Sequence, residues 1–233
     1  MYKLKNYAII LASGSGNRFG AKLPKQFVKI NKKTILERSI EIFENCKEID
    51  NIIVVITPEY INKAKKIIQK NKYKKIEYIL PGGEIRKDSS FIGVSAINEK
   101  EANVLIHDCA RPFVSKEIIK NCIKALDKYK AVGVAVPSTD TIIEVKNNII
   151  NNIPERKNIM NIQTPQGFKL SLIKKAHELS INDNNFTDDC GLIIKHNLAK
   201  IFIIEGDKYN IKITYPNDLI TAKQIIKNSI YKF

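Results

Sequence analysis

The chain has 233 residues, of which 44% are hydrophobic, and a formal net charge of +15. This length suits one large domain that buries enough surface to be stable without disulfides. The four cysteines and three histidines are scattered without zinc-site spacing, and isolated cysteines are typical of a reducing compartment. The apolar run at residues 7–12 is too short for a signal peptide or a membrane span. We therefore expect a cytoplasmic protein without a membrane partner.

The basic charge is spread along the whole chain and accompanies abundant Asn and Ile, which indicates a general compositional bias. A nucleic-acid-binding module is the competing class of protein. Such a module would need a clustered basic stripe or aromatic residues interleaved with cations, and the sequence has neither. We expect no nucleic-acid partner, and we attribute any functional part of the charge to attraction of phosphate substrates.

Strand and helix patterns alternate through the first 137 residues. Short β-branched runs predict strands at Tyr7–Ala12, Asn51–Thr57, Lys75–Leu80, Asn103–Asp108 and Ala131–Pro137. Amphipathic stretches predict helices at Thr34–Cys46, Glu59–Gln69, Lys87–Asn98 and Ser115–Tyr129. This alternation requires crossover connections between parallel strands. We therefore expect a three-layer, Rossmann-like α/β fold, with a mostly parallel twisted sheet and helices on both faces.

The alternation stops after Pro137. Two strand-like segments, Thr141–Val145 and Ile149–Ile153, flank a polar turn and predict a hairpin within a projecting β-arm at 139–163. The α/β pattern then resumes. It predicts a helix near Leu170–Ser180, a strand at Ile201–Glu205, a short strand at Asn210–Thr214 and a final helix at Pro216–Ser229. Because no repeat or linker divides the chain, residues 1–233 are expected to form one domain.

Polar segments rich in Gly, Arg and Asp follow the ends of successive predicted strands. These segments are Ser13–Lys25, Pro81–Ser89, His107–Pro112 and Pro137–Thr141. The carboxyl ends of parallel strands meet at one rim of a sheet, where ligands bind. The four segments therefore predict one shared site.

The first of these segments is suited to binding phosphate groups. Gly14 and Gly16 follow a strand and let backbone N–H groups approach phosphate oxygens. Phe19 stands where a dinucleotide fingerprint needs its third glycine, and no Gly-Lys-Ser/Thr sequence completes a Walker A loop. Arg18 and Lys25 instead add two cations to meet a triphosphate.

Residues 11–27 closely resemble the phosphate loop of the cytidylyltransferases that act on 2-C-methyl-D-erythritol 4-phosphate and on ribitol 5-phosphate. Further matching motifs follow in the family's order along nearly the whole chain. They are Gly82-Gly83 through Ser89, His107 through Pro112, Thr139-Asp140-Thr141, Arg156, Gln163 through Gln166, Thr187-Asp188-Asp189, and Gly206-Asp207 through Thr214.

The resemblance implies transfer of a cytidylyl group from CTP to a small polyol phosphate, with Mg²⁺ as cofactor. It also implies that Asp108 contacts the ribose and the metal-binding side of CTP. Charge stabilisation would come from the implied catalytic residues Arg18, Lys25 and Lys212. The implied nucleotide-binding residues are Leu11, Ala12, Ser13, Gly14, Gly16, Pro81, Gly82, Gly83, Arg86, Ser89, Asp108, Ala110 and Arg111. The implied acceptor-binding residues are Asp108, Thr141, Arg156, Thr164, Thr187 and Lys212.

Several of these residues also have a structural interpretation. Arg111 could support its loop, Asp88 could cap the following helix and Thr141 could be an ordinary strand residue. His107 is interpreted as a structural hydrogen-bonding residue, because a phosphate nucleophile is already ionised and needs no general base. An inactive nucleotide sensor is also an open alternative, although the cation set that includes Arg18 argues against it.

The acceptor is expected to be ribitol 5-phosphate or a closely related polyol phosphate. The alternative is 2-C-methyl-D-erythritol 4-phosphate, and another polyol or acid phosphate stays open as a third option. The methylerythritol enzymes usually have a Val-x-Arg start and a Leu-Trp pair before residues 163–164, whereas this chain reads Ile153-Pro154-Glu155-Arg156 and has no tryptophan. The arm carries exposed apolar positions, and a lone hairpin is marginal in water. We therefore expect a homodimer formed through the arm.

Overall fold

The computed structural model describes residues 4–14, 19, 24–183 and 185–228. Its centre is a seven-stranded sheet with the strand order β11-β7-β10-β6-β1-β4-β5. The strands are β1 (Asn6–Ala12), β4 (Asn51–Ile56), β5 (Ile76–Pro81), β6 (Asn103–Asp108), β7 (Ala131–Pro137), β10 (Met160–Lys169) and β11 (Ile201–Glu205). All neighbours are parallel except β10, which is antiparallel to both β6 and β7. The prediction of a mostly parallel sheet is confirmed.

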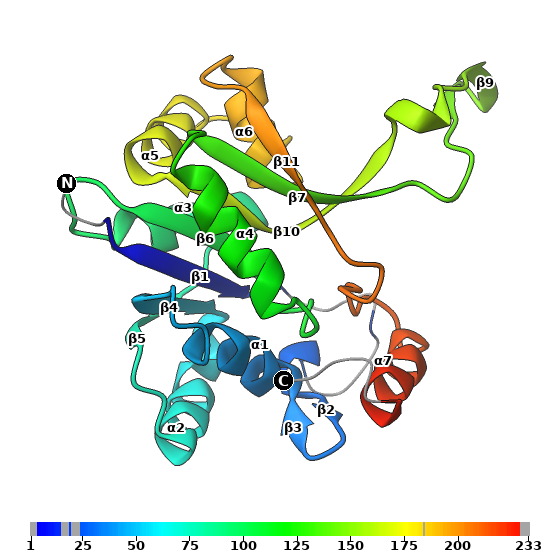
Figure 1. Cartoon of the computed structure of the whole chain (residues 1–233). Helices are drawn as coiled ribbons and strands as arrows, with labels where there is room; N and C mark the ends of the chain where they lie inside the picture. The colour runs from blue at the N-terminus through cyan, green and yellow to red at the C-terminus, as the bar shows by residue number, and fades with distance from the viewer. Residues whose placement is uncertain (1–3, 15–18, 20–23, 184, 229–233) are drawn as a thin grey trace.

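Helices cover both faces of this sheet (Figure 1). They are α1 (Ile35–Glu44), α2 (Ile61–Asn71), α3 (Arg86–Ser95), α4 (Lys116–Leu126), α5 (Leu170–Leu179), α6 (Asp189–Lys195) and α7 (Asp218–Lys227). Ala8 and Ile10 of β1 belong to one core cluster with α1 and α4, whereas Ile9 and Leu11 belong to a second cluster with α3, α5 and α6. Successive strand residues point to opposite faces, so the molecule has the expected three layers. No helix in the described ranges is long and apolar enough to cross a membrane.

Side-chain caps explain where two helices begin. At α1, Thr34 Oγ1 accepts a hydrogen bond from Glu37 N, and Glu37 Oε2 accepts one from Thr34 N. At α4, Ser115 Oγ accepts a hydrogen bond from Ile118 N, as its place before the helix predicts. The remaining short elements are η2 (Lys25–Phe27), η3 (Pro58–Tyr60), η4 (Arg156–Asn158), and the strand pair β2 (Lys29–Ile30) and β3 (Lys33–Thr34).

The predicted hairpin is present as β8 (Glu144–Lys146) and β9 (Ile149–Asn152), and it extends away from the main sheet (Figure 1). Asn147 and Asn148 form its turn, both with positive φ angles, the conformation that a tight two-residue hairpin turn favours. The pairing of β7 with β10 continues outward to Pro137 and Met160. The outer part of the arm therefore lies between these two residues, at 138–159.

In the second half of the chain, one expectation is wrong and one strand was not expected. The short strand expected at Asn210–Thr214 is not a strand. The segment instead bonds to neighbouring loops, with Ile213 N donating to Ala110 O. The ten-residue strand β10 was not expected, because it contains Pro165 and Gly167, and its register with β7 shifts between Gln163 and Gly167.

Candidate active site

A cavity of about 620 Å³ lies at the carboxyl ends of β1 and β6. Three of the four strand-end segments expected to meet contribute to its walls, and the fourth, which leads into the arm, does not. The lining residues are Leu11, Ala12, Ser13, Gly14, Lys25, Gln26, Ile35, Gly83, Glu84, Ile85, Arg86, Asp108, Cys109, Ala110, Phe186, Thr187, Lys212 and Thr214. The prediction that ligands bind at the strand ends therefore coincides with a cavity large enough for a small molecule.

The structure brings together most, but not all, of the described residues expected in the site. Those in the lining are Leu11, Ala12, Ser13, Gly14, Lys25, Gly83, Arg86, Asp108, Ala110, Thr187 and Lys212. Those outside the lining are Pro81, Gly82, Ser89, Arg111, Thr141, Arg156 and Thr164. Gly16 and Arg18 fall outside the described residues.

The turn after β5 packs closely against Ser13, the residue that follows β1. A Cβ added to Gly82 would lie 2.3 Å from Ser13 Cβ, so only glycine fits without a shift. Ser89 is buried beneath the turn, where its Oγ lies 2.6 Å from Ser13 Oγ and accepts a hydrogen bond from Gly83 N. Asp88 Oδ2 accepts a hydrogen bond from Ile85 N at 3.4 Å, which agrees with its interpretation as a helix cap. Ser89 thus supports the turn from below and does not line the cavity.

Asp108 holds two cations at the floor of the cavity. Arg86 Nε lies 3.0 Å from its Oδ1 and Lys212 Nζ lies 2.7 Å from its Oδ2. Burial alone would raise the pKa of Asp108, but the charges of Arg86 and Lys212 and their hydrogen bonds outweigh burial and lower this pKa well below its usual range. The carboxylate is therefore ionised at neutral pH.

Lys25 and Lys212 approach the cavity from opposite ends of the chain. Lys25 begins η2, and its Nζ donates a hydrogen bond to Ile213 O at 3.4 Å. The backbone N–H of Ile213 donates to Ala110 O, which holds the 210–214 segment against the end of β6. The segment that was expected to be a strand is therefore the element that brings Lys212 beside Asp108.

His107 and Arg111 have structural contacts. His107 is fully buried, and its Nε2 donates to Arg111 O, so its Nδ1 is left to accept a hydrogen bond from the Thr164 hydroxyl. Burial lowers the pKa of His107 to about 4, which keeps the ring neutral. The Arg111 guanidinium donates to the backbone oxygens of Asn210 and Ile162. These bonds agree with the structural interpretations of both residues.

Thr164 is also buried, and its side chain contacts the backbone of Asp108. Its Oγ1 accepts a hydrogen bond from Asp108 N at 3.1 Å. The Thr164–Pro165 peptide bond is cis, and the following Gln166 side chain bonds to Asp188 and to the backbone of Asp189. This segment of β10 therefore holds the ends of two other elements.

Sequence reasoning missed three side chains that organise the site: Lys87, Gln166 and Asp189. Gln166 and Asp189 lie within the quoted motifs, so their motif positions were the available signal. Lys87 lies within the quoted Gly82–Ser89 motif and had the same signal. It is buried, and its Nζ donates to the backbone oxygens of Ser180, Ile181 and Asp183, which precede Thr187.

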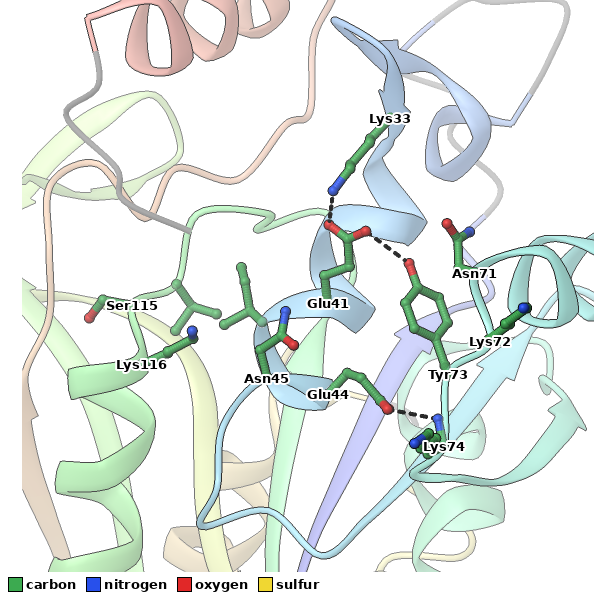
Figure 2. A pocket seen from close by; sticks show the side chains of 12 residues that line it. Lys33, Glu41, Glu44, Asn45, Asn71, Lys72, Tyr73, Lys74, Ser115 and Lys116 are labelled. Carbon is green, nitrogen blue, oxygen red and sulfur yellow. Dashed lines mark hydrogen bonds and ion pairs between the residues drawn. The ribbon is translucent and has the colours of Figure 1, made fainter.

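A second cavity of about 400 Å³ lies between the end of α1, the α2–β5 connection and the start of α4 (Figure 2). Its carboxylates already have partners within the protein. Glu41 accepts hydrogen bonds from Lys33 and Tyr73, and Glu44 accepts one from Lys74 N. None of the residues expected in the active site lines this cavity. We therefore assign the active site to the cavity at the carboxyl ends of β1 and β6.

The three-layer fold and the cavity at its strand ends, which Lys25, Arg86 and Lys212 line, are suited to binding a phosphorylated ligand. The family described as "IspD: 2-C-methyl-D-erythritol 4-phosphate cytidylyltransferase" matches residues 7–228, and the chain belongs to this family. It is therefore a cytidylyltransferase.

Individual relatives agree with this assignment. A 2-C-methyl-D-erythritol 4-phosphate cytidylyltransferase of Thermobifida fusca is 36% identical over 96% of this chain and 94% of its own length. The bifunctional ribulose 5-phosphate reductase/CDP-ribitol pyrophosphorylase Bcs1 of Haemophilus influenzae is 40% identical over 98% of this chain and 49% of its own length. The crystal structure of 4-diphosphocytidyl-2C-methyl-D-erythritol synthase from Anaerococcus prevotii superposes with a TM-score of 0.86, at 33% identity and 96% coverage of both chains. The expected preference for the ribitol branch is not confirmed.

Proposed function

We propose that the protein transfers a cytidylyl group from CTP to 2-C-methyl-D-erythritol 4-phosphate, releasing pyrophosphate. The observation that carries the proposal is the family match over residues 7–228, together with a cavity in which Lys25, Lys212 and Asp108 meet beside Thr187. Most of the relatives compared carry this acceptor in their names. We expect the reaction to take place in the cytoplasm.

In the proposed reaction, an oxygen of the acceptor phosphate attacks the α-phosphorus of CTP in line with the leaving group. The new P–O bond forms as the bond to the β-phosphate oxygen breaks, and pyrophosphate leaves with the electron pair. Two anions must approach each other, so fixed positive charge is the main contribution the protein can make. Lys25 and Lys212 would supply this charge, with Arg18 of the phosphate loop as a third cation.

Nucleotide selection would depend on the turn after β5. The N–H groups of Gly82 and Gly83 already donate to Ile56 O and Ser89 Oγ, so the backbone oxygens of this turn would accept hydrogen bonds from the amino group of a cytosine. The close packing of the turn against Ser13 leaves little room for a purine. Asp108 would contact the ribose and metal side of CTP. Because the acceptor phosphate is ionised at neutral pH, the proposal needs no general base. His107 is fully buried, and both of its ring nitrogens are engaged in hydrogen bonds within the protein.

Mg²⁺ fits this site as an ion held mainly by substrate. No cluster of three or more acidic, His or Cys ligands occurs among the residues that the structure describes. Mg²⁺ commonly binds through one or two carboxylates together with substrate phosphates and water. Asp108 offers one ionised carboxylate in the cavity. When bound, the ion would neutralise charge on the phosphates of CTP.

Recognition of the acceptor phosphate would involve a second subunit. Arg156 Nη2 donates a hydrogen bond to Thr141 Oγ1 at 2.9 Å, and both residues are exposed on the arm, away from the cavity lining of their own chain. The arm also exposes Ile143, Ile149 and Ile153. Burying these side chains in a two-fold dimer would allow the arm of one subunit to reach the acceptor side of the other.

Ribitol 5-phosphate is the second candidate acceptor. It is favoured by the Ile153-Pro154-Glu155-Arg156 sequence, by the absence of tryptophan and by the 40% identity to the Haemophilus influenzae enzyme.

The test is a direct competition between the two acceptors. CTP and Mg²⁺ are incubated with equal concentrations of both acceptors, and the two CDP products are separated and quantified at low conversion. Their ratio gives the ratio of kcat/KM values. We expect the methylerythritol product to dominate. Dominance of CDP-ribitol would overturn this proposal in favour of the second candidate.

A further inference from the structure

Three charged side chains form a continuous chain in the wall of the cavity, in which the two carboxylates are buried and Arg86 between them is partly buried. Arg86 lies between two carboxylates, with its Nε 3.0 Å from Asp108 Oδ1 and its Nη1 2.7 Å from Asp189 Oδ2. The Asp189 side chain is 1% exposed, against 12% for Asp108, which lines the cavity. Asp189 is therefore the inner member of the chain and Asp108 the member that faces the cavity.

Asp189 is held rigidly from several directions. Its other carboxylate oxygen, Oδ1, accepts a hydrogen bond from Ser90 Oγ of α3 at 2.5 Å. Its backbone N–H donates to Gln166 Oε1 at 3.0 Å, at the first residue of α6. A buried carboxylate with this many partners has one orientation, which makes it a fixed reference point for Arg86.

The two carboxylates share the same support. Asp108 N donates to Thr164 Oγ1, and Asp189 N donates to Gln166 Oε1, so residues on either side of the cis Thr164–Pro165 bond hold both backbones. Arg86 then joins the two side chains. Because the backbones are fixed by β10 and the side chains by Arg86, the direction of the Asp108 carboxylate depends on Asp189.

The charge of Asp189 also affects how strongly Arg86 pairs with Asp108. One guanidinium shared between two carboxylates leaves Asp108 able to accept from Lys212 through its second oxygen, at 2.7 Å. Without the negative charge of Asp189, Arg86 would pair with Asp108 alone and compete more strongly for that carboxylate.

We propose that Asp189 is a positioning residue for CTP binding, acting through Arg86 to orient the Asp108 carboxylate and to keep it available to the nucleotide. Since α6 begins two residues after Thr187, the same contact would link the segment on the proposed acceptor side to the segment on the proposed nucleotide side. The inference rests on the proposed role of Asp108 in nucleotide binding.

A double-mutant cycle on CTP affinity tests the proposal. The dissociation constant for CTP with Mg²⁺ is measured for the wild type, Asp189→Asn, Asp108→Asn and the double variant. We expect each single substitution to weaken binding by about tenfold, the size of the loss of one charged contact. If Asp189 acts through Asp108, the double variant should bind within about twofold of Asp108→Asn. Losses that multiply to about a hundredfold would show independent action and overturn the proposal.

Asp188→Asn is the matched control. Asp188 caps α6 by accepting a hydrogen bond from Gly191 N and bonds to Gln166, but among the described residues it forms no hydrogen bond or ion pair with Arg86. It should lower the thermal midpoint of unfolding without changing CTP affinity. A comparable affinity loss in this control would mean that any disturbance of α6 suffices, which would overturn the proposal.

A second variant keeps the proposal testable should Asp189→Asn not fold. Ser90→Ala removes one hydrogen bond from the Asp189 carboxylate and leaves every charge in place. It should weaken CTP binding about threefold in the wild-type background and not at all in the Asp108→Asn background. An equal effect in both backgrounds contradicts the proposal.

The same data separate this inference from the function on which it rests. Unchanged CTP affinity in Asp108→Asn would refute the proposed role of Asp108, and the inference with it. A loss in Asp108→Asn combined with wild-type affinity in Asp189→Asn would refute the inference alone.

Discussion

At the scale of single residues, the central feature is the pair of lysines that reach one cavity from opposite ends of the chain. Lys25 and Lys212 are both in the lining, and each has a contact that fixes its approach: Lys25 with Ile213 O, Lys212 with Asp108. Preorganised charges of this kind stabilise a transition state without reorganisation during the reaction.

Replacing either lysine should therefore lower the rate far more than the stability. We expect Lys25→Ala and Lys212→Ala each to reduce kcat by about 10²–10³-fold. Steady-state pyrophosphate release measures kcat, and urea unfolding checks that the fold is retained. Lys65→Ala, on the exposed face of α2, is the control and should match the wild type. A variant of either cavity lysine with near wild-type turnover would remove that lysine from the catalytic role.

His107 should make the stability of the protein depend on pH. Burial lowers its pKa from 6.5 to about 4, so between these values the unfolded chain binds a proton that the folded protein does not. Stability is then full above the unfolded pKa and falls as the pH drops towards about 4. We expect a loss of about 2 kcal/mol between about pH 7.5 and about pH 5 from this residue.

The measurement is the free energy of unfolding in urea at the two pH values. His107→Gln removes the titrating ring, so its loss of stability between the two values should be smaller than that of the wild type. Burial also lowers the pKa of His177, which adds to the loss in both proteins. Equal losses in the wild type and His107→Gln would show that His107 does not titrate in this range.

Residue roles were predictable from the sequence to different degrees. The motifs identified Lys25, Asp108 and Lys212 as residues of one site, and the structure brings them together. The contacts of Lys87 and Asp189 were not predictable. They depend on how α3 packs against the segment after α5, and sequence spacing does not report that packing.

At the scale of elements, the contact between α3 and the segment after α5 depends on Lys87. Its buried Nζ donates to three backbone oxygens, those of Ser180, Ile181 and Asp183, at 2.7 to 3.1 Å. Ser180 follows directly after α5, where helix carbonyls lack partners and a cation is favourable. This lysine therefore fixes the path of the chain towards Phe186 and Thr187 at the cavity.

Lys87→Met should remove these hydrogen bonds while keeping most of the side-chain volume. We expect the free energy of unfolding to fall by about 2 kcal/mol, the size of hydrogen bonds to a charged group. Urea denaturation measures this change. Lys175→Met, at an exposed position of α5, is the matched control and should change the stability by less than about 0.5 kcal/mol. Equal stability of Lys87→Met and the wild type would contradict the anchoring role.

Prediction of elements succeeded where the hydrophobic period was regular. β1, β4, β6 and β7 lie within a residue of their expected bounds, because buried parallel strands are continuous apolar runs. β10 was missed because Pro165, Gly167 and a register shift interrupt its pattern. The same interruption lets Thr164 and Gln166 hold Asp108 and α6, so the feature that hid the strand is the one that organises the site.

At the scale of the whole molecule, the arm extends away from the main sheet and leaves apolar side chains exposed (Figure 1). Its exposed isoleucines and its Arg156–Thr141 pair are the basis of the proposed dimer in which each arm completes the partner's acceptor site. The sequence and the fold of one chain are the basis of this proposal. The dimer contact would form between the arms of two chains.

Mixing two inactive variants tests whether the site is shared. Lys25→Ala and Arg156→Ala are combined in equal amounts under conditions in which subunits exchange. Half of the dimers would be mixed, and each mixed dimer would contain one site with both residues intact, which restores about a quarter of wild-type activity per subunit. Mass spectrometry verifies the mixed dimers. If they form without recovered activity, Arg156 does not act across the interface.

The nucleotide dependence of pyrophosphate release tests the proposed transfer of a cytidylyl group most directly. kcat/KM is measured for CTP, UTP and ATP with Mg²⁺ and 2-C-methyl-D-erythritol 4-phosphate, with an acceptor-free reaction as the blank. A site whose hydrogen bonds match cytosine leaves them unpaired with uracil, so we expect CTP to exceed UTP by about 10²-fold or more, with ATP lower still. Release above the blank should require the acceptor. Comparable kcat/KM values for CTP and UTP, or pyrophosphate release that is independent of the acceptor, would contradict the proposed function.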